Sequence, residues 1–207
     1  MTAPWLRAAV LLVAAYFLGS LPWSLWVAHW RGVNLRASGS GNLGATNVYR
    51  ALGPAWGIAV LLLDLGKGAL AVALARRFGV GLPPYLPVLA LLAVVLGHIF
   101  TVFASFRGGK GVAAGLGGLL ALAPGAGGLA VLVWVALFAL TRIVSMASLA
   151  AFVALPLATF FTQRSRPDYP YLLGLTVALG ALVWVRHRDN LRRILSGQEH
   201  RIKLGGR

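Results

Sequence analysis

The sequence predicts an all-α membrane protein with seven transmembrane helices, and its composition provides the first evidence. Of its 207 residues, 59% are hydrophobic and 11% are charged, whereas soluble domains average roughly 45–50% apolar and about 25% charged residues. The 26 glycines and 7 tryptophans fit the same class, because glycine is frequent in membrane helices and tryptophan at membrane interfaces. We therefore expect a single transmembrane domain over residues 1–207 and no soluble domain.

Seven apolar segments are candidates for spans of about 20 residues, the length that crosses a hydrocarbon core about 30 Å thick. The first is expected to bend near Pro22, and it lacks the cleavage pattern of a signal peptide. Residues 111–141 are uncharged and too long for one span, but the proline and glycines at 123–128 divide them into a short fourth helix, or a re-entrant loop, and a fifth helix. The segments are 8–30, 52–75, 84–103, the two parts of 111–141, 145–161 and 171–185.

Basic residues are distributed unevenly between the two predicted faces. There are 19 Lys and Arg against four acids, a net charge of +15, which suggests anionic lipid or anionic substrates rather than nucleic acid. The loops 31–50, 104–110 and 142–144 and the tail 186–207 hold 13 of the basic residues, and the opposite face holds 5. The positive-inside rule then predicts a cytoplasmic C-terminus and an N-terminus outside.

The chain contains no cysteine, which excludes thiol catalysis and thiolate metal sites. The first cytoplasmic loop instead has the composition of a phosphate-binding loop, and residues 36–50 read RASGSGNLGATNVYR. Its glycines permit positive φ and close approach of the backbone to a ligand, while Ser40, Asn42 and Asn47 supply small polar groups between Arg36 and Arg50. A simple glycine and serine connector with lipid-facing arginines is the alternative.

A second glycine-rich stretch surrounds Lys110, which has Gly108 and Gly109 before it and Gly111 after it. Glycine amides at a helix N-terminus, together with a lysine, are typical of an anion site. The stretch is not a Walker A loop, since Ala104 stands where a glycine is required and a glycine follows the lysine. A tight turn with a snorkelling lysine is the alternative.

The tail from residue 187 carries a third polar group, with His187, Asn190 and Arg193 on one face of a helix that continues from the seventh span. Its alternative is a juxtamembrane segment that binds anionic lipid. Ser145 lies in a polar stretch, 141–148, where a helix N-cap would explain it.

Asp64, Lys67 and His98 are ionisable residues within the second and third predicted spans. Asp64 and Lys67 are three residues apart, and we interpret them as a structural ion pair. His98 lies near the end of its span and is as plausible a structural donor as a catalytic group.

Taken together, these motifs resemble the bacterial acyl-phosphate:glycerol-3-phosphate acyltransferase family of integral membrane enzymes. The resemblance extends over the full chain, with Gln198 standing where the family often has threonine. It implies seven spans and an active site on the cytoplasmic face of the bacterial inner membrane. The matching motifs are RxxGSGNxGATNxxR at 36–50, GH at 97–98 with FRGGKG at 106–111, HRxNxxR at 187–193 with GxE at 197–199, DxxKG at 64–68 and VSxxS at 144–148.

The reaction implied by the resemblance transfers a fatty acyl group from acyl phosphate to the 1-hydroxyl of sn-glycerol 3-phosphate. The products are 1-acylglycerol 3-phosphate and inorganic phosphate, and no cofactor, metal ion or protein partner is expected. Acyl phosphate carries a good leaving group, so orientation and charge stabilisation can suffice for catalysis. Acyltransferases that use acyl-CoA or acyl carrier protein rely on His-x-x-x-x-Asp, a spacing that none of the four histidines has.

Residue roles follow from residue type, spacing and the resemblance. Lys110 and its neighbouring glycines, with Arg50, are expected to hold a phosphate, and His187 with Asn190 is expected at the acyl carbonyl; His187 and a substrate phosphate are both candidates for the proton acceptor. Glu199 is expected to anchor the tail by pairing with Arg193 or a loop arginine. The expected catalytic residues are His187, Asn190, Lys110 and Ser40, and the expected substrate-binding residues are Arg36, Asn42, Asn47, Arg50, Gly108, Gly109, Gly111, Ser145 and Arg193.

An organophosphate or lysophospholipid transporter is the alternative function, because it too would need basic anion sites among helices. Such transporters usually bind near the membrane midplane and contain internal repeats. Here the polar groups cluster at one predicted face, and the sequence shows no convincing repeat. A lipid-binding scaffold is a third interpretation, but it leaves the glycine-rich loops unexplained.

Overall fold

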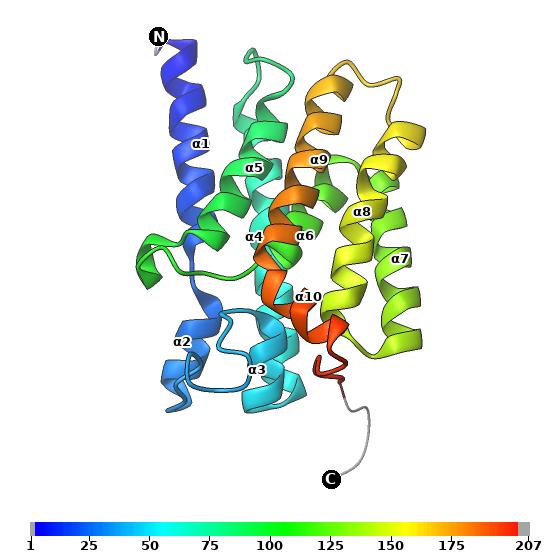
Figure 1. Ribbon diagram of the computed structural model, residues 1–207. Helices are drawn as coiled ribbons and strands as arrows, with labels where there is room; N and C mark the ends of the chain where they lie inside the picture. Colours follow the sequence, from blue (N-terminus) through cyan, green and yellow to red (C-terminus); the bar gives the residue numbers. More distant parts are fainter. Residues whose placement is uncertain (1–2, 203–207) are drawn as a thin grey trace. The chain divides into compact units, whose positions relative to one another are not determined.

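The computed structural model describes residues 3–202, and over that range the chain is helical, with ten α-helices and one short 3-10 helix (Figure 1). It divides into two compact units, residues 1–122 and 123–207. Lys203 and Arg207, which the charge count includes, lie outside the described residues. Within the described residues, six helical segments are long and apolar enough to cross a membrane: Pro4–Trp30, Pro54–Phe78, Leu86–Ala104, Pro124–Thr141, Val144–Thr162 and Tyr169–Arg186. The predicted short fourth helix is Val112–Leu122, eleven residues long.

The first unit is built around α4, which packs against α1, α5 and α6, while α1 packs along α5 (Figure 1). The short helices α2 and α3 lie at one end of this unit and contact α4. Its elements are α1 (Pro4–Ser20), α2 (Trp23–Trp30), α3 (Ala45–Leu52), α4 (Pro54–Phe78), α5 (Leu86–Ile99), the 3-10 helix η1 (Val102–Ala104) and α6 (Val112–Leu122).

The bend expected at Pro22 is a break between α1 and α2. It leaves backbone carbonyls without partners in the helix, and an unpaired carbonyl within a membrane costs several kcal/mol. Side chains from other helices provide the missing donors. Thr101 Oγ1 donates to the Ser20 carbonyl at 2.5 Å, and Lys67 Nζ donates to the Leu21 carbonyl at 3.1 Å.

Helices α4 and α6 approach closely because glycines face the partner backbone. A β-carbon on Gly68 would overlap the Ala114 carbonyl oxygen, and one on Gly117 would overlap the Leu65 carbonyl oxygen. Small residues allow this close packing, which supplies much of the attraction between membrane helices.

Helix α3 was not predicted, because residues 36–50 were expected to form a loop. Its eight residues are amphipathic, with Val48 fully buried, and a helix this short depends on tertiary packing rather than on its own propensity. Gly53, with φ of +91°, separates it from α4. Asn47 and Arg50 therefore lie on a helix.

The second unit consists of α7 (Pro124–Thr141), α8 (Val144–Thr162), α9 (Tyr169–Arg186) and α10 (Arg188–Leu195). Helix α8 packs between α7 and α9, and α10 contacts α8 and α9 (Figure 1). The break predicted at 123–128 is confined to Ala123, because Pro124 occupies the first position of α7. A proline is accepted there since the first amides of a helix have no partner in the helix.

The helix that was expected to continue from the last span into the tail is interrupted. His187 ends α9 and begins α10. Further along, the Ile202 amide donates to the Arg142 carbonyl at 2.9 Å, which returns the tail to the turn between α7 and α8. The tail is therefore folded against its own unit.

Candidate functional site

In the first unit, the structure brings the two glycine-rich motifs together. We call residues 31–44 loop one and residues 100–111 loop two. Arg36 Nη2 donates to the carbonyl of Ala104 at 3.1 Å and to that of Arg107 at 3.4 Å. The Leu43 carbonyl of loop one is also so near Gly109 that a β-carbon there would lie 2.9 Å from it. Arg36 thus joins the loops through backbone carbonyls.

Asn47 holds the shape of loop one around Ser40. Its side chain is 1% exposed, and its Nδ2 donates to the Leu35 and Ser38 carbonyls at 3.0 Å each. Its Oδ1 accepts the Ser40 amide at 3.0 Å. Gly39 is required beside it, because it has a φ of +55° and a β-carbon would overlap Asn47 Oδ1. The position of Ser40 therefore depends directly on the Asn47 amide.

The amides of Gly108 and Gly109 are used within the fold. Gly108 N donates to the Ile99 carbonyl at 2.9 Å, and Gly109 N donates to the His98 carbonyl at 3.1 Å. These bonds satisfy carbonyls at the C-terminal end of α5, where the helix leaves them without intrahelical partners. A β-carbon on Gly108 would overlap the His98 carbonyl oxygen. The two glycines therefore fix the path of loop two into Lys110.

The polar residues expected to reach a ligand are only partly covered. Ser40, Asn42, Arg50 and Lys110 are all half-buried. Gly111 has φ of +85° and directly precedes α6, so the chain turns sharply between Lys110 and the start of that helix. Partial exposure leaves these side chains reachable from outside the unit.

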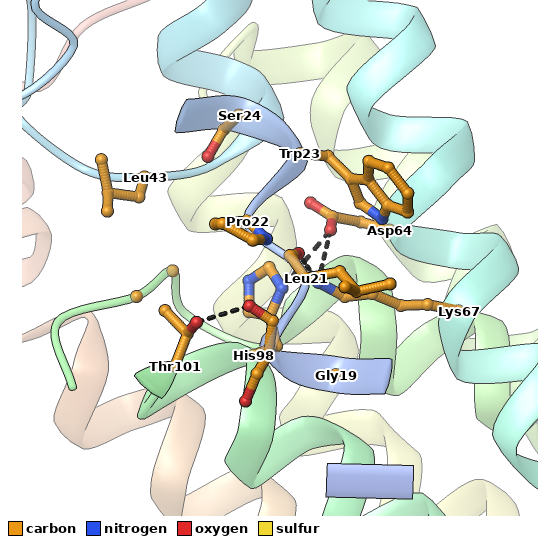
Figure 2. Close-up of a pocket in the computed structure, with 13 residues that line it drawn as sticks. Gly19, Leu21, Pro22, Trp23, Ser24, Leu43, Asp64, Lys67, His98 and Thr101 are labelled. Carbon is orange, nitrogen blue, oxygen red and sulfur yellow. Dashed lines mark hydrogen bonds and ion pairs between the residues drawn. The ribbon is translucent and has the colours of Figure 1, made fainter. Parts of the chain in front are cut away.

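A small pocket lies beneath the loops, at the break between α1 and α2 (Figure 2). Asp64 Oδ1 lies 2.8 Å from Lys67 Nζ, which confirms the predicted pair. His98 Nδ1 lies 3.5 Å from the same oxygen. All three residues are buried. The link to His98 joins two successive helices, α4 and α5, so no pattern within one helix could have predicted it.

In the second unit, Glu199 is the centre of a hydrogen-bonded group. Its Oε1 accepts Ser145 Oγ at 2.9 Å and Asn190 Nδ2 at 2.6 Å, and its Oε2 accepts Arg193 Nε at 2.7 Å. The predicted pairing of Glu199 with Arg193 is confirmed. The interpretation of Ser145 as a helix N-cap is wrong, because Ile143 holds that position and the Ser145 hydroxyl binds the carboxylate instead.

This environment determines the charge on Glu199. Burial raises the pKa of the carboxyl group, but hydrogen bonds from Asn190, Arg193 and Ser145 and the charge of Arg193 outweigh it and hold the pKa below its ordinary value. A carboxylate that accepts several hydrogen bonds is favoured in its ionised form. Glu199 is therefore an anion that fixes three predicted site residues in place.

His187 lies at the junction of α9 and α10 and is buried, with 3% exposed. Its Nδ1 lies 2.8 Å from the Val183 carbonyl oxygen. Because a carbonyl can only accept, Nδ1 carries a proton, and in the neutral ring Nε2 is then the acceptor. This assignment leaves Nε2 as the nitrogen that could accept a proton.

The predicted site residues fall into two groups. Those in the first unit are Ser40, Lys110, Arg36, Asn42, Asn47, Arg50, Gly108, Gly109 and Gly111, and those in the second are Ser145, His187, Asn190 and Arg193. Within each unit, residues distant in sequence are brought together. Sequence analysis did not identify the hydrogen bond of Thr101 to the helix break or the contact between Asp64 and His98.

Comparison with known proteins identifies the family. A family model described as glycerol-3-phosphate acyltransferase matches residues 9–197. The glycerol-3-phosphate acyltransferase of Geobacter sulfurreducens is 42% identical over 198 residues, covering 96% of this chain and 99% of that protein. The one of Aquifex aeolicus is 41% identical, covering 95% of this chain and 100% of that protein.

Solved structures agree with these relatives. The crystal structure of PlsY, an integral membrane glycerol 3-phosphate acyltransferase, in its glycerol 3-phosphate form has a TM-score of 0.87 and 40% identity, with 95% of this chain and 96% of that chain covered. Its lysophosphatidic acid form gives 0.84 and 39%, with 95% of each chain covered. The chain therefore belongs to the glycerol-3-phosphate acyltransferase family of multi-pass integral membrane enzymes.

Proposed function

We propose that this protein transfers a fatty acyl group from acyl phosphate to the 1-hydroxyl of sn-glycerol 3-phosphate. The products are 1-acylglycerol 3-phosphate, a lysophosphatidic acid, and inorganic phosphate. The observation that carries the proposal is the match to PlsY over almost the whole chain in forms with glycerol 3-phosphate and with lysophosphatidic acid. Those two molecules are the acceptor and the product of the proposed reaction.

The first unit supplies groups suited to phosphate. Lys110 and Arg50 are cations on loop two and α3, and Ser40 and Asn42 are small polar groups on loop one. We assign Lys110 and Arg50 to one phosphate group, and Ser40 and Asn42 to the second phosphate or the glycerol hydroxyls. Asn47 contributes by fixing the loop around Ser40. Positioned cations stabilise phosphate charge without needing an enzymic nucleophile.

In the second unit we assign His187 and Asn190 to the acyl carbonyl. The Val183 carbonyl fixes the His187 ring through Nδ1, and Glu199 holds the Asn190 amide. The proton of the attacking hydroxyl passes either to His187 Nε2 or to a substrate phosphate. The conservative variant His187→Gln separates these two routes, since it keeps a polar group at that position but cannot accept the proton as a base.

The proposed topology has seven spans, with Val112–Leu122 as the short fourth, the N-terminus outside and the C-terminus in the cytoplasm. It rests on the count of 13 against 5 basic residues on the two faces. It places the active site on the cytoplasmic face of a bacterial inner membrane, where both water-soluble glycerol 3-phosphate and a lipid-soluble acyl donor are accessible.

A comparison of acyl donors tests the proposed reaction. Purified protein receives labelled glycerol 3-phosphate with either acyl phosphate or acyl-CoA of equal chain length in the same detergent, and the lipid product is identified by chromatography. We expect turnover with acyl phosphate and inhibition by inorganic phosphate and vanadate, which would occupy an anion site. Acyl-CoA is expected to be a poor donor, since its thiolate is a weaker leaving group.

The result has three informative outcomes. Comparable turnover with acyl-CoA would show that acyl phosphate is not the specific donor, but the protein would still be an acyltransferase. Absence of product with either donor would reject the proposed function. Uptake of intact glycerol 3-phosphate into vesicles without acylation would instead support the transporter.

A further inference from the structure

Asp64, Lys67 and His98 form a buried cluster in the first unit, and His98 is not required to satisfy the backbone at the helix break. The Lys67 ammonium satisfies the Leu21 carbonyl, and Asp64 neutralises Lys67. These two residues alone account for a broken helix inside a membrane. His98 adds no donor to that carbonyl, yet its ring lies against Asp64 and is buried.

The His98 ring lies between the charged pair and loop two. On one side, Nδ1 is 3.5 Å from Asp64 Oδ1. On the other, Nε2 is so near Gly109 that a β-carbon on that glycine would overlap it. Asp64, Lys67 and His98 line one pocket (Figure 2). Gly108 and Gly109 line the same pocket. The His98 ring therefore contacts both the Asp64 carboxylate and the backbone of Gly109, which directly precedes Lys110.

Loop two has further attachments to the same region, and they act on its backbone. The Gly109 amide donates to the His98 carbonyl. At the start of loop two, Thr101 Oγ1 bonds the Ser20 carbonyl at the helix break. A displacement of the His98 ring would thus be transmitted over one residue to Lys110, while the ends of the loop stay attached.

We propose that Asp64 and His98 are positioning residues for loop two: Asp64 orients the His98 ring, and the ring sets where Gly109 and Lys110 lie. This inference rests on the proposed function, since it assumes that Lys110 binds a substrate phosphate. A displacement of about 1 Å at a binding group can cost roughly a hundredfold in rate. Loss of the ring contact therefore affects substrate binding more than folding.

The test is a set of variants at the ring, with KM and kcat measured for both glycerol 3-phosphate and acyl phosphate. His98→Asn keeps a donor near the Nδ1 position for Asp64 but leaves space beside Gly109. We expect a rise of about tenfold or more in KM for the substrate whose phosphate Lys110 binds, with thermal stability in detergent near that of the wild type.

A double-mutant cycle then tests whether Asp64 acts through His98. We expect Asp64→Asn to raise the same KM and Asp64→Asn with His98→Asn to raise it no further than the larger single effect, because coupled residues are not additive. If Asp64→Asn fails to fold because Lys67 is left unpaired, the double variant Asp64→Asn with Lys67→Gln takes the place of Asp64→Asn in the cycle.

A matched control comes from the second unit, where Asp168 pairs with Arg166 at 2.8 Å and is also buried. Asp168→Asn removes a comparable ion pair and is expected to leave both KM values unchanged. Wild-type KM values in folded His98→Asn would overturn the inference, as would fully additive effects in the cycle. The wild-type protein is assayed first, so a failure of the proposed function appears as missing wild-type activity. It is therefore distinguished from a failure of this inference, which appears only in the variants.

Discussion

Lys110 is the only lysine in either glycine-rich loop. Lys110→Ala is expected to lower turnover by about 10²–10³-fold, corresponding to about 2.7–4 kcal/mol, by analogy with the loss of one donor to a developing anion. Lys110→Arg should recover only part of it, because a planar guanidinium does not replace a compact ammonium in a glycine-lined turn. The measurement is initial rate per folded protein in detergent.

Arg201→Ala is the matched control for this variant. It also removes one positive charge, from an exposed position in the tail, and should leave the rate near that of the wild type. A fully active, well-expressed Lys110→Ala protein would show that loop two does not take part in the reaction.

Glu199 makes the stability of the second unit dependent on pH. Because its folded-state pKa is lowered, its contribution is complete above the ordinary carboxyl pKa and is lost as the pH falls through the lowered value. We expect thermal stability in detergent to drop on acidification through that range. In Glu199→Gln the acid-dependent part of the drop should be smaller and stability at neutral pH should be lower.

The comparison for Glu199 is the exposed acid Asp189. Asp189→Asn should retain the full acid dependence of the wild type. Identical pH profiles for the wild type and Glu199→Gln would mean that this carboxylate contributes nothing to stability.

At the scale of single helices, the sequence predicted what depends on length and composition. The long apolar runs and the break at Pro22 follow from local pattern, and so does the pair of Asp64 and Lys67, three residues apart. Helix α3 was not predicted, because eight residues show too little periodicity to distinguish a helix from a loop. The break at His187 was not predicted, because the residues on both sides of it are compatible with a helix.

The candidate site was predicted as motifs, but few of the contacts within it were predicted. Arg193 was one of two kinds of partner expected for Glu199, the other being a loop arginine, whereas the convergence of Ser145 and Asn190 on the same carboxylate depends on how α8 and α10 pack. The glycines of loop two were expected to offer amides to a ligand. Two of those amides bind the end of α5, a use that only the path of the folded chain determines.

The packing of α4 on α6 gives a prediction with an internal control. Gly68→Ala places a methyl group against the Ala114 carbonyl, and such overpacking typically costs about 1–3 kcal/mol. Gly66, two residues earlier on α4, is exposed and has nothing near its β-position. Gly66→Ala should be neutral or slightly stabilising. Equal thermal stability of the two variants in detergent would contradict the packing argument.

For the whole molecule, membrane orientation can be measured directly because the chain has no cysteine to remove. Ser105→Cys in loop two is expected to resist a membrane-impermeant maleimide in intact cells and to react after permeabilisation. Ser165→Cys, in the exposed turn between α8 and α9, should react in intact cells. Labelling of Ser105→Cys from outside would reverse the proposed topology.

The Asp64 and Lys67 pair also bears on how the protein enters the membrane during synthesis. A lone charged residue at the centre of a nascent helix adds about 2.5–3.5 kcal/mol to the cost of insertion. These two charges lie three residues apart on one helix, so they can neutralise each other as soon as that helix forms. Helix α4 can therefore leave the insertion machinery before α5 has been made. The Leu21 carbonyl gains its partner when α4 docks against the break between α1 and α2.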